Sequence, residues 1–240
     1  MNNLDLAMSY KCRASGLSDI AASIKKDEVP KGVMTHLKKW ILERTHNERI
    51  PMANKYTVKG NRAETEAVEF VEEHCPDLGG LLLPNELGQK SNDFFQGTWD
   101  VMTPNGEKII DIKNSFTAET FPFYEEVIPT KGYDLQVGVG YCSISGATEG
   151  EVIYCLMNAS IDEIANEAAR YCFQTGQEES EEIFAMFKKR MTYDHLEPLQ
   201  RIKRFTVKKD PVLIGLFEKR VIACRSELLS ILNKYRPHKI

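Results

Sequence analysis

Asp100 and the tripeptide Asp111-Ile112-Lys113 constrain what this chain can fold into more than any other feature of the sequence. Two β-prone runs flank a Pro-Asn-Gly turn, so residues 94–114 are predicted to form a β-hairpin. Because alternate residues of a strand point to the same face, Asp111 and Lys113 project together and Ile112 projects to the other face. Asp100 lies on the first strand of the predicted hairpin, beside the strand that carries Asp111 and Lys113. We therefore expect two carboxylates and an ammonium group to converge on one patch, which suits a divalent metal ion and a phosphodiester.

A simpler interpretation of the same residues has to be weighed. An Asp-x-Lys pattern is common by chance, and edge strands often carry charges that discourage aggregation. Taken alone, the tripeptide favours this simpler interpretation. The surrounding sequence has to supply the case for a functional site.

Composition places the chain among globular proteins. Its 240 residues are 42% hydrophobic and 28% charged, which is ordinary for one soluble domain of residues 1–240. No apolar run is long enough to span a bilayer, and the N-terminus lacks the pattern of a secretory signal, so a cytoplasmic location is expected, with no membrane partner. The six cysteines and five histidines lack metal-ligand spacing, which argues against a zinc ribbon or an iron–sulfur cluster.

The charge is distributed unevenly. Residues 1–185 hold 17 basic against 30 acidic side chains, whereas residues 186–240 hold 14 basic against 5 acidic ones. A basic segment is often a solvated face, but it can also guide a polyanion. The candidates for contacts to a nucleic-acid backbone are Lys188, Lys189, Arg190, Arg201, Lys203 and Arg204.

Hydrophobic periodicity and turn residues predict an alternating order of elements. The order in the middle of the chain is helix, three strands, helix, strand. Helices are predicted at 18–28, 31–46, 60–75, 132–145, 160–174, 178–192 and from Asp210 onward, and strands at 84–91, within 94–114, and at 151–156.

Glu64 is unusual among the glutamates of the helix predicted at 60–75. At 100° per residue it falls inside the apolar arc formed by Ala67, Val71 and Cys75, whereas the other glutamates face away. A carboxylate on a buried stripe is costly unless it is paired or binds a metal ion. Glu64 is therefore expected to need a partner.

These motifs, taken in order, resemble the PD-(D/E)XK nuclease superfamily, and within it the phage exonucleases of the lambda-exonuclease or YqaJ-type group. The likeness covers roughly residues 10–170, and Trp99 replaces the proline of the usual Gly-x-Pro-Asp. The matching segments are Arg13 to Asp19, Gly60 to Glu64, Gly97-x-x-Asp100, Asp111-Ile112-Lys113, Thr120 to Phe123, the series Tyr133, Gln136 and Tyr141, and Val152 to Leu156.

The resemblance implies an α/β fold with a restriction-endonuclease-like core. Such a core has the order αβββαβ and a central mixed sheet flanked by helices. It would occupy residues 60–157, with a helical addition at 1–59 and a basic helical addition at 158–240.

The chemistry of phosphodiester hydrolysis assigns roles to the matched residues. Asp100, Asp111 and the main-chain carbonyl of Ile112 are the expected ligands of Mg²⁺, or of Mn²⁺ in its place, and Glu64 completes the site directly or through water. Lys113 would position the water or stabilise the phosphate. Gln136 and Tyr133 could orient the nucleophile or substrate, although helix packing explains them equally well.

The resemblance further implies that Arg13, Ser15 and Ser18 hold a terminal phosphate. Ser18 is equally well explained as a helix N-cap. One position departs from the family pattern, because Gln136 lies five residues before Tyr141 and the usual spacing is four. On an α-helix this shift rotates the side chain by about 100°.

The leading hypothesis is a metal-dependent DNA exonuclease that digests duplex ends, 5′→3′, in phage recombination. The resemblance implies a ring-shaped homo-oligomer such as a trimer, working inside the host cell with a single-strand annealing protein. Two alternatives remain open: an endonuclease or single-strand nuclease on the same core, and a non-catalytic DNA-binding protein.

Overall fold

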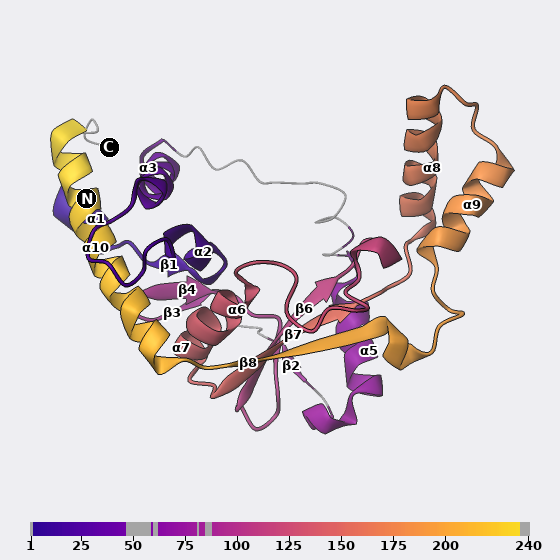
Figure 1. Ribbon diagram of the computed structural model, residues 1–240, viewed down its shortest axis with the longest axis horizontal. Helices are drawn as coiled ribbons and strands as arrows, with labels where there is room; N and C mark the ends of the chain where they lie inside the picture. The colour runs from indigo at the N-terminus through magenta and orange to yellow at the C-terminus, as the bar shows by residue number, and fades with distance from the viewer. Residues whose placement is uncertain (1, 47–58, 60–61, 81, 85–87, 236–240) are drawn as a thin grey trace.

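The computed structural model describes residues 2–46, 59, 62–80, 82–84 and 88–235 as a mixed α/β molecule (Figure 1). Its helices are α1 (Asn3–Met8), α2 (Leu17–Ile20), α3 (Lys31–Thr45), α5 (Glu64–His74), α6 (Tyr133–Leu135), a π-helix (Gln136–Tyr141), α7 (Cys142–Ser145), α8 (Ile161–Thr175), α9 (Glu181–Met191) and α10 (Pro211–Tyr235). Its strands are β1 (Cys12–Arg13), β2 (Leu83–Pro84), β3 (Lys90–Ser91), β4 (Phe95–Gly97), β5 (Val101–Met102), β6 (Lys108–Asn114), β7 (Glu149–Cys155) and β8 (Ile202–Lys208).

The main sheet is five-stranded and mixed, in the order β2-β5-β6-β7-β8. Its β6–β7 pair is parallel, with Asp111 opposite Val152, and the other pairs are antiparallel. The predicted hairpin is present as β5 and β6, with Val101 opposite Ile110. Both faces of β6 and β7 are buried, as expected for parallel strands covered by helices.

The alternation of β6 assigns its side chains to two different cores. Ile110 and Ile112 pack with Ala67 and Val71 of α5. Ile109, on the opposite face, packs with residues of the segment from α6 to α7. One face of the sheet is thus covered by α5 and the other by the π-helical segment, which places Asp111 beneath the latter.

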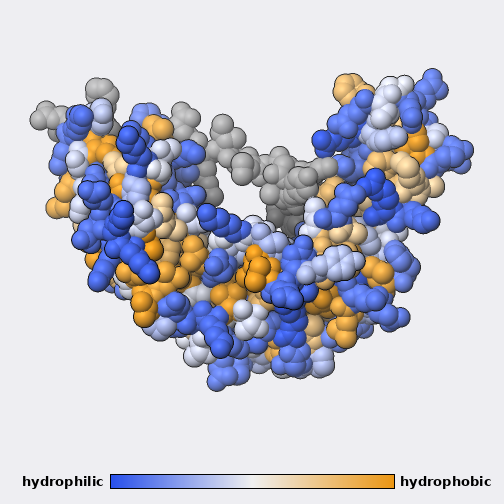
Figure 2. Space-filling model, viewed as in Figure 1, coloured by the Kyte–Doolittle hydropathy of each residue, from blue (hydrophilic) through white to orange (hydrophobic). Residues whose placement is uncertain are grey.

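A second, three-stranded sheet has the order β1-β4-β3 and belongs to the N-terminal part of the chain. The helices α1, α3 and α10 pack around it in one apolar cluster that includes Tyr10, Trp40, Phe95 and Phe217. Figure 1 shows this group as one arm and the α8–α9 pair as the other. Figure 2 shows the surface hollowed between the two arms.

Several predicted elements differ from the observed ones. The helix predicted at 18–28 ends at Ile20. Three residues later the Ser23 backbone adopts a positive φ of 50° and turns the chain. The strand predicted at 84–91 is two short strands, β2 and β3, in different sheets. The C-terminal addition is not wholly helical, because β8 joins the main sheet beside β7.

The remaining helices lie close to their predicted positions, and α10 begins after Asp210, which accepts a hydrogen bond from the Leu213 N–H at 2.9 Å. Within the described residues, no helix is both long and apolar enough to cross a membrane. Gly60 and Asn61, which belong to the family motif, lie outside the described residues.

Candidate active site

Asp111 and Lys113 form the centre of the candidate site. They extend from the same face of β6, and Lys113 Nζ lies 2.7 Å from Asp111 Oδ2. The Asp111 side chain is only 1% exposed. The Asp111 carboxylate is therefore held by one ammonium group, and Gln136 Nε2 lies 3.5 Å from its Oδ1.

Asp100 lies just before β5 and reaches across to β6. Its Oδ2 accepts a hydrogen bond from the Ile112 N–H at 2.6 Å. The N–H and C=O of one strand residue point to the same side of the strand, so the Ile112 carbonyl also points toward Asp100. The predicted set of Asp100, Asp111 and the Ile112 carbonyl is therefore brought together.

The pKa values of Asp100, Asp111 and Lys113 show that the site has too little positive charge for its two carboxylates. Burial, and to a lesser extent the neighbouring Asp111, raise the pKa of Asp100 to about 7. Burial also raises the pKa of Asp111. Burial alone would lower the pKa of Lys113, but Asp111 and Asp100 outweigh it, raise the pKa and keep the ammonium group charged. One ammonium group does not balance two buried carboxylates.

This donor set fits a hard divalent cation. Mg²⁺ takes one or two carboxylates with carbonyl oxygens and retains several waters. Among the described residues no cluster of three His, Cys, Asp or Glu side chains could hold a metal ion. Asp100, Asp111 and the Ile112 carbonyl could therefore offer such an ion two carboxylates and one carbonyl oxygen.

Glu64 differs from its prediction. It is the first residue of α5 and is exposed, although Ala67 and Val71 of the same predicted arc are buried. The Cα–Cβ bonds of a helix tilt toward its N-terminus, so the side chain of the first residue extends beyond the helix end. Its charge is a minor cause of the raised pKa of Asp100, and the helix that carries it packs against β6, the strand of Asp111.

Gln136 reaches the site in spite of its shifted spacing. Its Nε2 donates to Tyr141 Oη at 2.7 Å and lies 3.5 Å from Asp111 Oδ1. Residues 136–141 form a π-helix, in which residues five apart are hydrogen-bonded. The π-helix thus brings Gln136 and Tyr141 to the same face, which an α-helix would not do.

Two aromatic residues of this segment border the ionic groups. The Tyr133 ring centroid lies 5.1 Å from Lys113 Nζ, a cation–π distance. Burial and the charge of Asp111 raise the pKa of Tyr141, so its hydroxyl keeps its proton. Sequence reasoning used Tyr141 only as a spacing marker and missed its contact with Gln136.

The predicted terminal-phosphate residues lie on the arm with the smaller sheet. Arg13, Ser15, Lys39 and Trp40 line a pocket of about 230 Å³, and Arg13 Nη2 is paired with Glu43 Oε2 at 2.9 Å. Ser18 is not part of this lining. It is partly buried against Gly132, close to the start of α6.

The predicted basic cluster divides into two groups. Lys188, Lys189 and Arg190 are exposed in the last turn of α9, and Arg190 pairs at 2.8 Å with Glu119, six residues after Lys113. Lys203 is partly buried on β8.

Arg201 and Arg204, by contrast, have structural contacts within the fold, and their predicted contacts with a DNA backbone stay a prediction. Arg201 is 9% exposed and donates to the Leu156 carbonyl at 3.1 Å. Arg204 lies 2.8 Å from both Asp77 and Glu151. Arg204 lies on β8, which was not predicted, and Arg201 directly precedes this strand.

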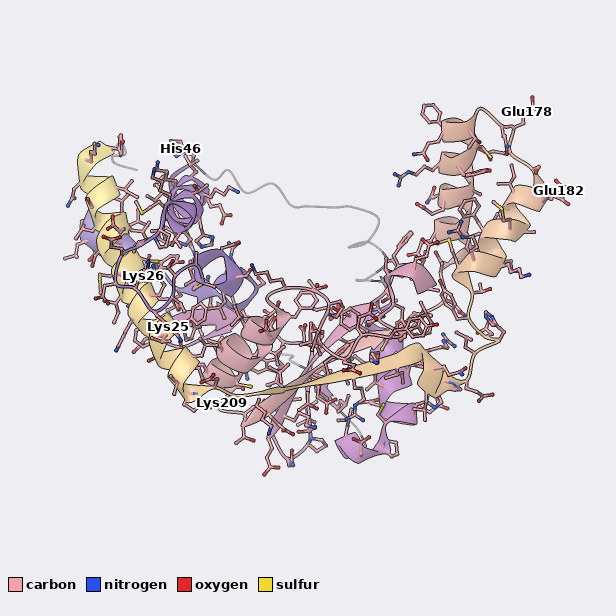
Figure 3. The ribbon with its side chains drawn as sticks, viewed as in Figure 1. Lys25, Lys26, His46, Glu178, Glu182 and Lys209 are labelled. Carbon is pink, nitrogen blue, oxygen red and sulfur yellow. The ribbon has the colours of Figure 1, made fainter. Side chains whose placement is uncertain are left out.

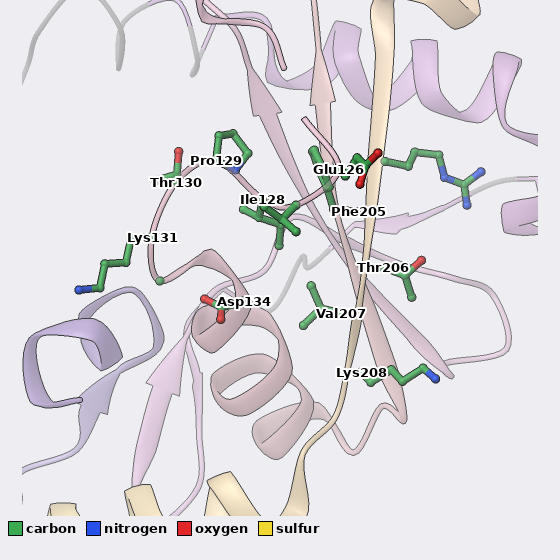
Figure 4. A pocket seen from close by; sticks show the side chains of 13 residues that line it. Glu126, Ile128, Pro129, Thr130, Lys131, Asp134, Phe205, Thr206, Val207 and Lys208 are labelled. Atoms are coloured by element: carbon green, nitrogen blue, oxygen red, sulfur yellow. The ribbon is translucent and has the colours of Figure 1, made fainter. Parts of the chain in front are cut away.

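A further groove lies beside β8, away from the carboxylates. It has a volume of about 700 Å³ between the loop 126–132 and the residues 204–208. Figure 4 shows Ile128 and Val207 at this groove, with Lys131 and Lys208 pointing away from each other on its two sides. It contains none of the predicted metal ligands.

Lys59 is a buried cation that sequence reasoning missed. It is 1% exposed, and its Nζ donates to the carbonyls of Ser115, Phe116 and Met157 at 3.1, 2.9 and 2.8 Å. No periodicity marks it. Its place just before the predicted helix was the only available signal.

The paired carboxylates just before β5 and on β6 are held by a fold that resembles those of solved structures. No family model matches the chain, and no curated protein sequence matches it. Among solved structures, the chain is similar to a phage-related exonuclease from Haemophilus somnus 129PT, with a TM-score of 0.75 and 19% identity over 98% of this chain and 100% of the other.

A second similar structure is the alkaline exonuclease LHK-Exo from Laribacter hongkongensis. Its TM-score is 0.61 at 14% identity, over 98% of this chain and 95% of the other. The same enzyme in complex with dAMP also matches with a TM-score of 0.61, over 97% of this chain and 94% of the other. The predicted likeness to phage exonucleases is thus confirmed as a likeness of fold over nearly the whole chain.

Proposed function

We propose that this protein is a metal-dependent DNA exonuclease. The observation that carries the proposal is the buried pair Asp100 and Asp111, whose pKa values are raised by burial, with the Lys113 ammonium group 2.7 Å from Asp111. The fold that holds this pair is similar to those of two exonucleases. The complex of one of them with dAMP supports a nucleotide substrate for this chain as well.

The ligands of the metal ion would be Asp100, Asp111 and the Ile112 carbonyl, with Mg²⁺ as the expected ion and Mn²⁺ as a substitute. When bound, such an ion neutralises the phosphate, lowers the pKa of a water and stabilises the leaving oxygen. Glu64, exposed at the start of α5, is available to bind a water of that ion.

The remaining residues position and polarise the substrate. Lys113 stays charged and is 25% exposed, so its ammonium group can contact a phosphate oxygen while it stays near Asp111. Gln136 holds the orientation of Asp111 and is itself held by Tyr141. The flank formed by Tyr133 restricts water around the ammonium group, which strengthens its interaction with an anion.

The direct test is a time course on end-labelled linear duplex DNA with Mg²⁺, with and without a 5′ phosphate. We expect release of mononucleotides from the 5′ end, no release in chelator, and none from an Asp111→Ala variant. Full activity of that variant would refute the site. The 5′ phosphate comparison tests the proposed roles of Arg13, Ser15 and Ser18.

Closed circular duplex separates the exonuclease from its alternatives. An exonuclease leaves the circle intact, whereas an endonuclease cuts it, and a single-strand nuclease degrades only the denatured DNA. A DNA-binding protein without chemistry would shift the linear duplex in a gel and leave it whole.

The biological setting of the proposal is phage recombination, with a ring-shaped homo-oligomer such as a trimer enclosing the duplex and a single-strand annealing protein as partner. Its support is the likeness of fold to a phage-related exonuclease. Light scattering would measure the oligomeric state, and a mass larger than that of the 27.3 kDa monomer is expected.

A further inference from the structure

Lys59 joins three chain segments that meet at the edge of the candidate active site. Ser115 and Phe116 directly follow β6, and Met157 lies two residues after the end of β7. Because the two strands are parallel, their carboxyl ends lie side by side, and the Ser115 N–H donates to the Cys155 carbonyl at 2.9 Å. A single ammonium group therefore bridges both strand ends.

Each N–H donor of the Lys59 ammonium group has a hydrogen-bond acceptor. It carries three N–H donors, and three carbonyl oxygens accept them. Burial lowers the pKa of Lys59 to about 8, and the charge of Glu163 offsets this only in part. A buried cation is costly unless its donors are satisfied, so these three hydrogen bonds strongly constrain the segment that carries Lys59.

The segment in question leads into α5. The Lys59 carbonyl accepts from the Ala63 N–H at 2.9 Å, and the Ala63 carbonyl accepts from the Ala67 N–H at 2.9 Å, so helical bonding continues from Lys59 into α5. Arg62, in the same turn, donates to the Asn158 carbonyl at 2.9 Å. Two basic side chains thus attach the start of this helix to the ends of β6 and β7.

Glu64 depends on this attachment. Within the described part of the chain its side chain makes no hydrogen bond or ion pair, and it is exposed. Among the described residues, therefore, no side-chain hydrogen bond or ion pair holds Glu64 against β6. Its position relative to β6 is set by the main chain of the preceding turn.

We propose that Lys59 is a positioning residue that sets Glu64 against the Asp100–Asp111 pair by fastening the start of α5 to the carboxyl ends of β6 and β7. The proposal rests on the proposed function for the metal site. It assigns Lys59 no contact with substrate. Loss of the fastening would leave both carboxylates on their strands but move Glu64 away from them.

The test is a double-mutant cycle on Mn²⁺ binding, measured by calorimetry without DNA. Lys59→Met keeps the apolar stem and removes all three donors. Substitutions behind metal ligands typically weaken affinity about 10–100-fold, and we expect a loss in this range for Lys59→Met. Because the effect passes through Glu64, the Lys59→Met/Glu64→Gln variant should bind no more weakly than Glu64→Gln alone.

Arg220→Met is the matched control. Arg220 is also buried, at 3% exposed, and donates to the carbonyls of Ala22, Ser23, Lys26 and Glu28, in the other arm. We expect it to lower the melting temperature as Lys59→Met does but to leave Mn²⁺ affinity unchanged. If Lys59→Met keeps wild-type Mn²⁺ affinity, or if its effect adds fully to that of Glu64→Gln, the proposal is overturned.

Two further experiments keep the result interpretable. If Lys59→Met does not fold, Arg62→Gln replaces it in the cycle, since its partly exposed side chain fastens the same turn. The same variants are assayed on end-labelled duplex. A wild type that binds Mn²⁺ but cleaves no DNA contradicts the proposed function alone, because the binding cycle still reports on Lys59.

Discussion

The carboxylates of Asp100 and Asp111 lie in an environment that opposes their charge. Each is desolvated by the strands and helices around it, and their mutual repulsion is only partly offset by Lys113. A divalent cation removes this conflict, since it favours both ionised forms at once. At the scale of single residues, the proposed metal ion would therefore stabilise the site.

This conflict predicts a stability gain for Asp100→Asn in chelator. The folded pKa of about 7 lies above the ordinary value of 3.8, so the contribution of this group is present at low pH and is lost as pH rises through about 7. The variant should melt a few degrees above wild type at pH 8, since 1 kcal/mol corresponds to about 2–4 °C for a chain of this size.

Thermal melts in chelator at pH 5 and pH 8 measure this effect. The difference should be smaller at pH 5 than at pH 8, because the penalty builds up between pH 3.8 and about 7, and it should reverse in saturating Mg²⁺, where only the wild type keeps both ligands. Exposed Asp134 supplies the control variant Asp134→Asn, for which no change is expected. Equal melting temperatures of Asp100→Asn and wild type at pH 8 would contradict the prediction.

At the scale of elements, β8 is held to β6 and β7 by one buried carboxylate. Glu151 of β7 is 2% exposed and lies 2.6 Å from Lys108 Nζ and 2.8 Å from Arg204 Nε. Burial alone would raise the pKa of Glu151, but the hydrogen bonds from Arg204 and Lys108 lower it. The three strands are thus joined by one ionic cluster away from the candidate site.

Glu151→Gln should therefore destabilise the fold by about 1–3 kcal/mol near pH 7. Because the folded pKa is lowered, the stabilisation is present above the ordinary value of 4.5 and is lost as pH falls through the folded value. Urea unfolding at pH 7 and pH 3.5 measures the difference, which should shrink at the lower pH. A constant difference would show that the charge of Glu151 has no part in it.

The π-helix is the second element whose packing can be tested. A Cβ at Gly140 would lie 2.5 Å from the Ala14 Cβ and 3.0 Å from the Ala14 Cα, which are backbone-linked atoms that cannot move away cheaply. Gly215, inside α10, has nothing within 4 Å of such a Cβ. The two glycines therefore make a matched pair.

Gly140→Ala should cost about 1–3 kcal/mol through overpacking. It should also lower nuclease activity, because the same π-helix carries Gln136. Gly215→Ala should stabilise the protein by about 0.5–1 kcal/mol, since alanine is the better helix former. Melting temperatures and initial rates of both variants provide the test, and a Gly140→Ala variant as stable as wild type would argue against the tight contact.

At the scale of the whole molecule, charge is sorted between the arms. Figure 3 shows Glu178 and Glu182 at the tip of the α8–α9 arm, with Lys25 and Lys26 on the opposite arm. The basic residues Lys188 and Lys189 end α9 close to the segment that follows β6. This basic end, and not the acidic tip, is the part of the arm suited to a phosphate backbone.

Lys188→Glu/Lys189→Glu should weaken binding to duplex DNA and reduce the salt dependence of the affinity by about 2 in slope, one per lost phosphate contact. Fluorescence anisotropy over a range of salt concentrations, in Ca²⁺ to prevent cleavage, is the measurement. Lys25→Glu/Lys26→Glu changes the net charge equally on the other arm and should have the smaller effect. If both double variants weaken binding alike, only net charge matters.

The sequence by itself determined the local chemistry of the central hairpin. Alternation along a strand was enough to put Asp111 and Lys113 on one face and Ile112 on the other, because strand periodicity is a property of neighbouring residues. The turn sequence likewise placed β5 beside β6, with Asp100 at its start. The helices α8, α9 and α10 followed from apolar spacing and capping residues.

Only the tertiary structure decided which distant residues meet these groups. The π-helix that aligns Gln136 with Tyr141, the exposure of Glu64 and the use of Arg201 and Arg204 within the fold all depend on contacts between remote segments. So does the pairing of β8 with β7 and the burial of Lys59 against three carbonyls. Such contacts leave no periodic trace in the chain, because packing and desolvation arise only when the elements are assembled.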